Sequence, residues 1–392
     1  MSVNYPFSQR IEHFVQPKQW ASMRVAKELE ARTGKKITHF EKGDYQGPDF
    51  ETPEHMLDAT VKALRDGYVR YNPGPGLPEL REEIAKEMTQ RGRKTEPEEV
   101  IVTAGAKQAL HMSLLTFLED GAEVIFPNPG YPPDEVWAKY AKAVIKHTPL
   151  TKPDWQFEVD KLASMITPNT RLLIINTPQR PNGHLVENPE EIAELCKKFP
   201  QLIVITDEIF SHVVYDGKAH KSIAAVPGME DRTIVIDTFS KTYAMTGWRI
   251  GWAVAARPII DKLSIFLQDS MTNVAAFIQR AAHAAMVGPQ DWVIAKTALL
   301  QKKRDRIVAG LNNVPGLKCD TPSGAFYAFP DITGTGMTSQ EFTDRLMENA
   351  GVAVVAGNAF GSQGEGYVRV TYATSDDDID EGIERMTTEL SK

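Results

Sequence analysis

Two adjacent segments, NPEEIAELCKKF (residues 188–199) and LIVITDE (residues 202–208), decide the fold class. The first opens with Asn188 as a helix cap, continues with acidic residues and has amphipathic spacing, which predicts a helix. The second is an apolar, β-branched run, which is typical of a strand buried on both faces. A helix leading directly into such a strand indicates α/β architecture.

The same alternation continues on both sides of these segments. VIVTAG (residues 100–105) is an apolar run that ends in glycine, and AKQALHMSLLTFL (residues 106–118) follows with helical spacing. Further buried strands are expected at residues 123–126, 172–175 and 233–236. Strands separated by helices predict a largely parallel sheet.

The two ends of the chain have a different pattern. Residues 19–32 and 289–312 have the spacing of long amphipathic helices, and residues 326–329 and 367–372 resemble strands. We therefore expect two domains. The large α/β domain is predicted at residues 45–285, and a small α+β domain is predicted to combine residues 1–44 with residues 286–392.

Composition excludes several classes of protein. The chain has 392 residues, is 42% hydrophobic and 24% charged, and carries a net charge of −8. These values exclude a disordered chain, a collagen-like chain and a coiled coil. An acidic chain without a basic run is a poor ligand for nucleic acid and for anionic membranes.

Cysteine usage and hydropathy bear on the compartment. Cys196 and Cys319 lie far apart, so neither a disulfide framework nor a metal site is expected. No secretory signal is visible, and no apolar run approaches the roughly 20 residues of a membrane helix. We predict a cytoplasmic enzyme.

Two strand ends offer groups for binding. In TAGAKQAL (residues 103–110) a strand gives way to a helix at Gly105, which can cradle a phosphate, although any strand-to-helix turn can contain glycine. Asp207 follows a buried strand, in the crevice where open α/β sheets bind ligands. It could pair with a cofactor cation, or it could simply cap a helix.

Two later stretches offer cations. DTFSKTYAMTGWRIGW (residues 237–252) places hydroxyls and Arg249 near Lys241, which suits phosphate binding and an amine nucleophile. In YVRVTYAT (residues 367–374), Arg369 lies within an apolar strand and needs a counter-charge. A substrate carboxylate or a structural ion pair could supply that charge.

The order and spacing of these features resemble the class I/II aminotransferases, the aspartate aminotransferase-like enzymes of fold type I that depend on pyridoxal 5′-phosphate (PLP). The resemblance extends from about Ile37 to Thr374. It includes the stretches PDFETPEHM (48–56), YNPGPGLPELREEIA (71–85), PNPGYP (127–132) and PSGAFYAFP (322–330).

This resemblance implies the PLP-dependent transferase fold type I, in which a large domain with a mostly parallel seven-stranded sheet accompanies a small α+β domain. It implies a ping-pong transfer of an amino group between an L-α-amino acid and an α-keto acid. It also implies a homodimer with shared active sites.

The resemblance also assigns roles to residues. Lys241 is expected to form the internal aldimine and to shuttle a proton, Asp207 to face the pyridine nitrogen, and Tyr131 to stack on the ring. Arg369 is expected to bind the α-carboxylate of the substrate. The groups expected to hold the phosphate are Gly105, Ala106, Lys107, Thr238, Ser240, Arg249 and, from the neighbouring subunit, Tyr71.

The entrance to the site is expected to determine substrate choice. The loop GDYQGPDF (residues 43–50) carries three residues more than the family pattern, with Gly43 at its start. Gly43 and Trp20 are expected to lie near the substrate, and Tyr45 and Gln46 are further candidates for the pocket. The side-chain preference cannot be inferred from these residues.

The sequence departs from the family at two positions near the cofactor's O3′ atom. Arg180 stands where the family has asparagine, and Phe210 stands where it has tyrosine. We hypothesise that Arg180 replaces both as the O3′ partner, because charge-assisted hydrogen bonds are the stronger kind. The alternative is a register shift that brings Asn182 or Asn176 to the ring and leaves Arg180 in solvent.

These departures leave other functions open. An altered O3′ environment could favour an elimination (lyase) reaction, or oxidation of an amino acid by O₂, on the same fold. A non-catalytic, aminotransferase-like domain that binds a ligand is the alternative from a different class.

Overall fold

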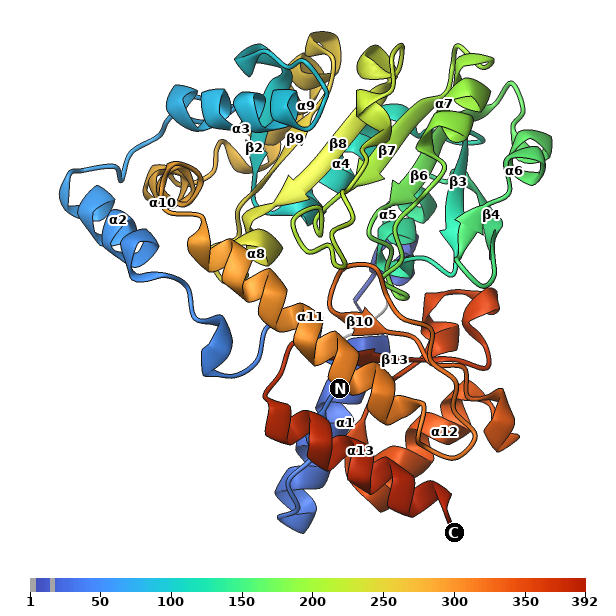
Figure 1. Cartoon of the computed structure of the whole chain (residues 1–392). Helices are drawn as coiled ribbons and strands as arrows, with labels where there is room; N and C mark the ends of the chain where they lie inside the picture. Colours follow the sequence, from blue (N-terminus) through green and yellow to red (C-terminus); the bar gives the residue numbers. More distant parts are fainter. Residues whose placement is uncertain (1–4, 15–17) are drawn as a thin grey trace.

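The computed structural model describes residues 5–14 and 18–392, and its upper part in Figure 1 is built on one large sheet. Within these residues the sheet has eight strands in the order β2-β9-β8-β7-β6-β3-β4-β5. The strands are β2 (Val100–Thr103), β3 (Glu123–Asn128), β4 (Val144–Thr151), β5 (Gln156–Phe157), β6 (Thr170–Asn176), β7 (Ile203–Asp207), β8 (Thr233–Thr238) and β9 (Gly251–Val254).

The sheet is mostly parallel, as predicted. Strands β4, β3, β6, β7 and β8 pair in parallel, whereas β9 runs against both of its neighbours. The predicted number of seven strands is too low by one. The additional strand is β5, which turns back on β4 at the sheet edge, where Leu150 pairs with Phe157 and both side chains are buried.

Helices cover both faces of the sheet (Figure 1). Apolar residues of α4, α5 and α9 pack on one face, and those of α3, α10, α6 and α7 pack on the other. Because both faces are covered, the central strands β6, β7 and β8 are buried almost throughout. The helices of this part are α2 (Glu54–Arg65), α3 (Pro78–Gln90), α4 (Ala106–Phe117), α5 (Glu135–Tyr140), α6 (Val159–Met165), α7 (Pro189–Lys197), α8 (Phe239–Thr242), α9 (Arg257–Met271) and α10 (Ala276–Val287).

The lower part of Figure 1 combines both ends of the chain. A parallel pair joins β1 to β11, and a three-stranded sheet has the order β10-β13-β12. The amphipathic segments predicted near both ends form α1 and α11, and the two predicted strands form β10 and β13. These elements are α1 (Lys18–Thr33), β1 (Thr38–His39), α11 (Asp291–Leu311), β10 (Tyr327–Ala328), α12 (Ser339–Arg345), β11 (Val352–Ala353), β12 (Val355–Ala356), β13 (Val368–Thr371) and α13 (Asp376–Leu390).

Helix α11 connects the two parts. It begins near α8, beneath the large sheet, and runs diagonally to the lower part in Figure 1. Its apolar residues Leu300, Ile307 and Leu311 join the core that also contains Phe326 and Val370. Among the described residues, no helix combines the length and the apolar character needed to cross a membrane.

Candidate active site

A cavity of about 720 Å³ lies where the strands of the large sheet end and the smaller part begins. Its position agrees with the rule that open α/β sheets bind ligands at the carboxyl ends of their strands. Most residues predicted to bind cofactor or substrate line this single cavity. They are Gly43, Ala106, Lys107, Tyr131, Arg180, Asp207, Thr238, Ser240, Lys241, Arg249 and Arg369.

One end of the cavity is suited to a phosphate. Gly105 precedes α4 with φ of 79°, and a Cβ atom there would lie 2.8 Å from Nη2 of Arg249. Ala106 and Lys107, at the start of α4, line the cavity together with Arg249, Thr238 and Ser240, and the first N–H groups of a helix have no carbonyl partner one turn earlier. A dianionic phosphate would satisfy these donors.

Lys241 lies on the short helix α8, between that end and the lower part. Its Nζ donates to the carbonyl oxygen of Gly43 at 2.8 Å. Burial lowers the pKa of Lys241 to about 8; Asp44 opposes the shift, and three arginines of the cavity add to it. This shift increases the unprotonated, nucleophilic fraction of the amine near neutral pH.

Asp207 ends β7 and points into the cavity. Its Oδ2 accepts a hydrogen bond from Nη2 of Arg180, and its Oδ1 accepts one from the backbone N–H of Ile209 at 3.3 Å. Burial raises the pKa of Asp207, and the charge of Arg180 opposes that rise. A buried carboxylate is the group that would keep a pyridine nitrogen protonated, because the pyridinium would then be its cationic partner.

Arg180 turns into the cavity. Its Cζ lies 4.0 Å from the centre of the Tyr131 ring, and only 11% of its side chain is exposed. The alternative in which Arg180 points to solvent is therefore wrong. Asn182 donates to Gln179 at 2.9 Å, and Asn176 accepts from the backbone N–H of Arg180 at 2.6 Å.

Phe210 has no polar group to offer at the cavity. It is 1% exposed and packs edge-on against Phe326 and Tyr327. Arg180, in contrast, contacts both Asp207 and Tyr131. Asp207 is expected to face the cofactor ring nitrogen, and Tyr131 is expected to stack on the ring.

Arg369 lies on β13 and is 1% exposed. Its Nη2 donates to the carbonyl oxygen of Glu41 at 2.7 Å, its Cζ lies 4.4 Å from the centre of the Tyr327 ring, and its Nε has no partner. Within the described ranges no carboxylate approaches it to ion-pair distance, so the alternative of a structural ion pair is wrong. Its unused donors suit a carboxylate ligand.

Two predicted residues lie apart from this group. Tyr71 is 86% exposed and does not line the cavity of its own chain. Trp20 belongs to α1, but its side chain falls outside the described part of the structure.

Asp134 is a cavity residue that the sequence analysis missed. It follows Tyr131 by three residues, and the 3-10 turn Pro132–Asp134 directs it towards Arg180. Burial raises the pKa of Asp134 to about 8, because the opposing charge of Arg180 does not offset the loss of hydration. The spacing of one helical turn from Tyr131 was the only signal in the sequence.

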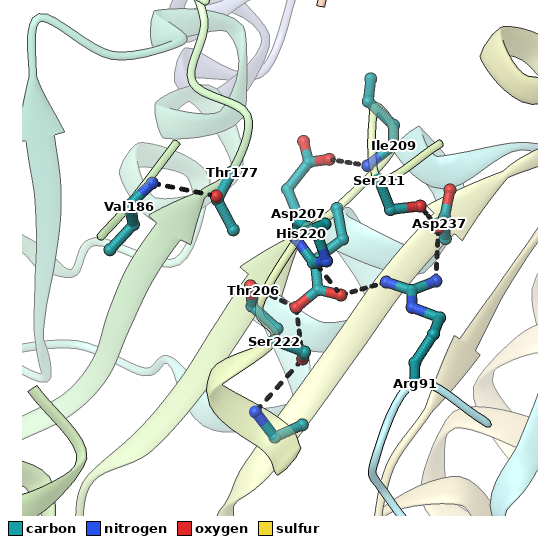
Figure 2. A network of polar contacts seen from close by, with 12 residues as sticks. Arg91, Thr177, Val186, Thr206, Asp207, Ile209, Ser211, His220, Ser222 and Asp237 are labelled. Atoms are coloured by element: carbon teal, nitrogen blue, oxygen red, sulfur yellow. Dashed lines mark hydrogen bonds and ion pairs between the residues drawn. The ribbon is translucent and has the colours of Figure 1, made fainter. Parts of the chain in front are cut away.

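A buried polar network lies next to Asp207 (Figure 2). Arg91 forms ion pairs with Glu208, at the end of β7, and with Asp237 of β8 at 2.9 Å. Ser222 donates to Glu208 at 2.6 Å, and Ser211 donates to Asp237 at 2.8 Å. Burial opposes ionisation of Arg91, but the two carboxylates raise its pKa.

This network holds the two strand ends that carry cavity residues. Glu208 follows Asp207 directly, and Asp237 accepts from the backbone N–H of Thr238 at 2.6 Å. Arg91 thus ties the carboxylate at one end of the cavity to the hydroxyl groups at the other. His220 lies against Glu208, and burial lowers the pKa of His220 to about 4, so it stays neutral there.

Comparison with known proteins places the chain in a class. The family model described as "Aminotransferase class I and II" matches residues 35–386, and the chain belongs to this family. Members of this family use PLP, and the predicted enzyme class and fold type are confirmed. The alternative of a non-catalytic binding domain receives no support from these findings.

Several proteins similar to this chain are named aminotransferases. The aspartate aminotransferase of Pyrococcus abyssi is 40% identical, over 86% of this chain and 88% of the relative. The aromatic-amino-acid aminotransferase 2 of Thermococcus litoralis is 38% identical over the same shares. The structure of aspartate aminotransferase from Thermus thermophilus with maleate has a TM-score of 0.91 at 31% identity, covering 98% of this chain and 100% of that one.

Proposed function

We propose that this protein binds PLP in the described cavity and moves an amino group between an L-α-amino acid and an α-keto acid by a ping-pong mechanism. The observation that carries the proposal is that one cavity contains a lysine amine, a buried carboxylate, a phosphate cradle and an arginine with an unused donor. These groups are Lys241, Asp207, the start of α4 and Arg369.

The residues present fit the cofactor. Gly105 leaves the space beside Arg249 that a Cβ atom would fill, and the donors around it match a dianion. When bound, PLP supplies an aldehyde for the amine of Lys241 and a ring that takes up electrons released at the substrate Cα. Asp207 would keep the ring nitrogen protonated, and the phenol of Tyr131 would lie over one face of the ring.

Side chains of the protein would bind the substrate and transfer the proton. Arg369 would hold the substrate carboxylate, which fixes the Cα atom relative to Lys241. The amine of Lys241, with a pKa of about 8, can accept the Cα proton and return it to the cofactor. The Arg369 side chain is only 1% exposed, so the carboxylate end of the site would be shielded from water.

We also propose that Arg180 is the partner of the O3′ atom. Its position between Asp207 and Tyr131 supports this role, because O3′ and the ring nitrogen belong to the same ring. A permanent cation there would stabilise the O3′ phenolate more strongly than the neutral donors of the family.

The assembly and the domain boundaries remain our proposals. We propose a homodimer in which Tyr71 reaches the phosphate of the neighbouring subunit, which its 86% exposure supports. We propose that residues 45–285 form the cofactor-binding domain and that residues 1–44 and 286–392 form the small domain. The cytoplasmic location stays a prediction from cysteine usage; both cysteines are free and buried.

Substrate choice is proposed from the names of the relatives. Aspartate and aromatic amino acids are the donors named for them, so both classes belong in the first assays. Gly43 and Tyr45 line the cavity, as expected of residues that select a side chain.

The test is a panel of amino donors against pyruvate, 2-oxoglutarate and oxaloacetate, followed by cofactor absorbance and by keto-acid yield. Amino transfer predicts one keto acid formed per amino group transferred, with no ammonia and no uptake of O₂. Release of ammonia would instead favour elimination, and ammonia together with O₂ consumption would favour oxidation. A protein that neither becomes coloured with PLP nor links it to Lys241 would refute the proposal.

A further inference from the structure

Lys296 is a buried lysine for which neither the sequence analysis nor the proposed reaction has a use. It lies in the second turn of α11 and is 3% exposed. Its Nζ donates to the carbonyl oxygen of Lys241 at 2.6 Å and also to that of Thr242. Both acceptors are backbone atoms of α8, the short helix that carries the reactive amine.

The surroundings of Lys296 offer no compensating anion. No carboxylate in the described part of the chain lies within ion-pair distance of Nζ, and the nearest side chains are rings. Nζ lies 5.4 Å from the centre of the Tyr45 ring and 5.3 Å from that of Trp292. Burying an unpaired ammonium is expensive, so its contacts with α8 need an explanation.

A second lysine on the same helix shows the ordinary arrangement. Lys303 is 2% exposed, and its Nζ pairs with Asp376 at 2.8 Å and with Asp49 at 3.1 Å. Lys303 therefore serves as a buried ion-pair partner between α11 and its neighbours. The Nζ of Lys296 donates instead to backbone carbonyl oxygens, which carry no full negative charge.

The carbonyls at the end of α8 explain the contact. The last carbonyl groups of a helix have no N–H partner within the helix, and they carry the negative end of its dipole. Burial and the charge of Lys241 lower the pKa of Lys296 to about 7. Its two contacts survive the loss of a proton, because a neutral amine still has two N–H groups for two acceptors.

The carbonyl oxygen of Lys241 is held from a second side as well. The hydroxyl of Tyr45 donates to it at 2.5 Å. Tyr45 belongs to the loop that also receives the Lys241 side chain, through Gly43. The residue that carries the reactive amine is thus fixed at its backbone by Lys296 and Tyr45 and at its tip by Gly43.

We propose that Lys296 is a positioning residue for Lys241, which holds the backbone of α8 so that the amine reaches both the cofactor and the substrate Cα. This inference rests on the proposed function of Lys241. Its consequence is that loss of the Lys296 amine impairs proton transfer by Lys241 more than it impairs binding of the substrate, which Arg369 controls.

The test compares Lys296→Met with Lys303→Met, a matched loss of a buried lysine from the same helix. We expect Lys296→Met to lower kcat about tenfold or more, since small misplacements of catalytic groups have large effects. We expect KM for the amino donor to change by about twofold at most. The kinetic isotope effect from a donor deuterated at Cα should increase, because proton transfer becomes more rate-limiting.

Lys303→Met should lower stability but leave the isotope effect at the wild-type value. If Lys296→Met does not fold, the same increase in isotope effect is expected of Lys296→Gln, whose amide is shorter. An isotope effect that stays at the wild-type value in both Lys296 variants would overturn the proposal.

A measurement without cofactor separates this inference from the proposed function. In the cofactor-free protein, backbone amides of residues 239–245 should exchange with deuterium faster in Lys296→Met than in wild type and in Lys303→Met. Unchanged exchange would show that Lys296 does not hold α8, whatever the reaction is. Faster exchange in a protein that fails to transfer amino groups would refute only the proposed function.

Discussion

Replacing Arg180 by alanine tests the ion pair at the centre of the cavity. In the cofactor-free protein this change leaves the carboxyl group of Asp207 buried without its cationic partner. Only 11% of the Arg180 side chain and 6% of the Asp207 side chain are exposed, so solvent screens the pair little. Breaking a buried pair by removing one partner costs about 3–5 kcal/mol.

The loss in free energy of unfolding should depend on pH, and the protonation of Asp207 determines whether the loss is larger at low or at high pH. Burial already raises the folded-state pKa of Asp207 above its unfolded value, and removal of Arg180 raises it further. A carboxyl group with a raised pKa contributes stability at low pH, and this contribution is lost as the pH rises through the folded pKa. Arg180→Ala should therefore lower the free energy of unfolding by about 3 kcal/mol at pH 8, and by less at pH 5.

The assay is denaturant unfolding of cofactor-free wild type and variant at both pH values. Arg81→Ala is the control, because Arg81 donates to the carbonyl oxygens of Val100 and Pro97, and its loss leaves no buried, ion-paired carboxylate behind. Its cost should be the same at pH 5 and pH 8. Equal losses for Arg180→Ala at both pH values would refute the claim that Arg180 neutralises Asp207.

Three further predictions concern the loaded cavity. In the protein with bound PLP, Arg180→Ala should shift the pH titration of cofactor absorbance to higher pH, and an unchanged titration would refute the role at O3′. Gly105→Ala should weaken PLP binding about tenfold or more in an equilibrium titration, because the new Cβ would lie 2.8 Å from Nη2 of Arg249 and the backbone has φ of 79°. Wild-type affinity would contradict the phosphate cradle. Arg369→Met should raise KM for the amino donor about 100-fold while PLP affinity stays within about twofold, and an unchanged KM would exclude Arg369 as the carboxylate ligand.

The strands and helices predicted from periodicity are those with their own apolar pattern. Strands β3, β6, β7 and β8 are buried on both faces, and their sequences are therefore mostly apolar. Strand β5 has only two residues, and strand β9 follows a cavity loop. Their pairing depends on neighbours distant in sequence, which no local pattern records.

The candidate site was predicted mainly from the family resemblance. The residues alone left a helix cap open for Asp207 and an ion pair open for Arg369, and the resemblance assigned their roles; the structure brings Lys241, Asp207 and Arg369 to one cavity. The orientation of Arg180 depends on the Tyr131 ring, which lies 49 positions earlier in the chain. Lys296 contacts a backbone carbonyl 55 residues away. A contact with a backbone atom does not require a particular side chain in the partner, so the sequence gives no sign of it.

The shared guanidinium of Arg91 has a consequence for how this enzyme tolerates change. Both ends of the cavity depend on one side chain, so an alteration at Glu208 or at Asp237 disturbs the far end as well as its own. Substitutions at these three positions should prove non-additive, and natural variants should exchange them as a set. A designer who enlarges the cavity would gain most freedom by leaving this buried trio intact.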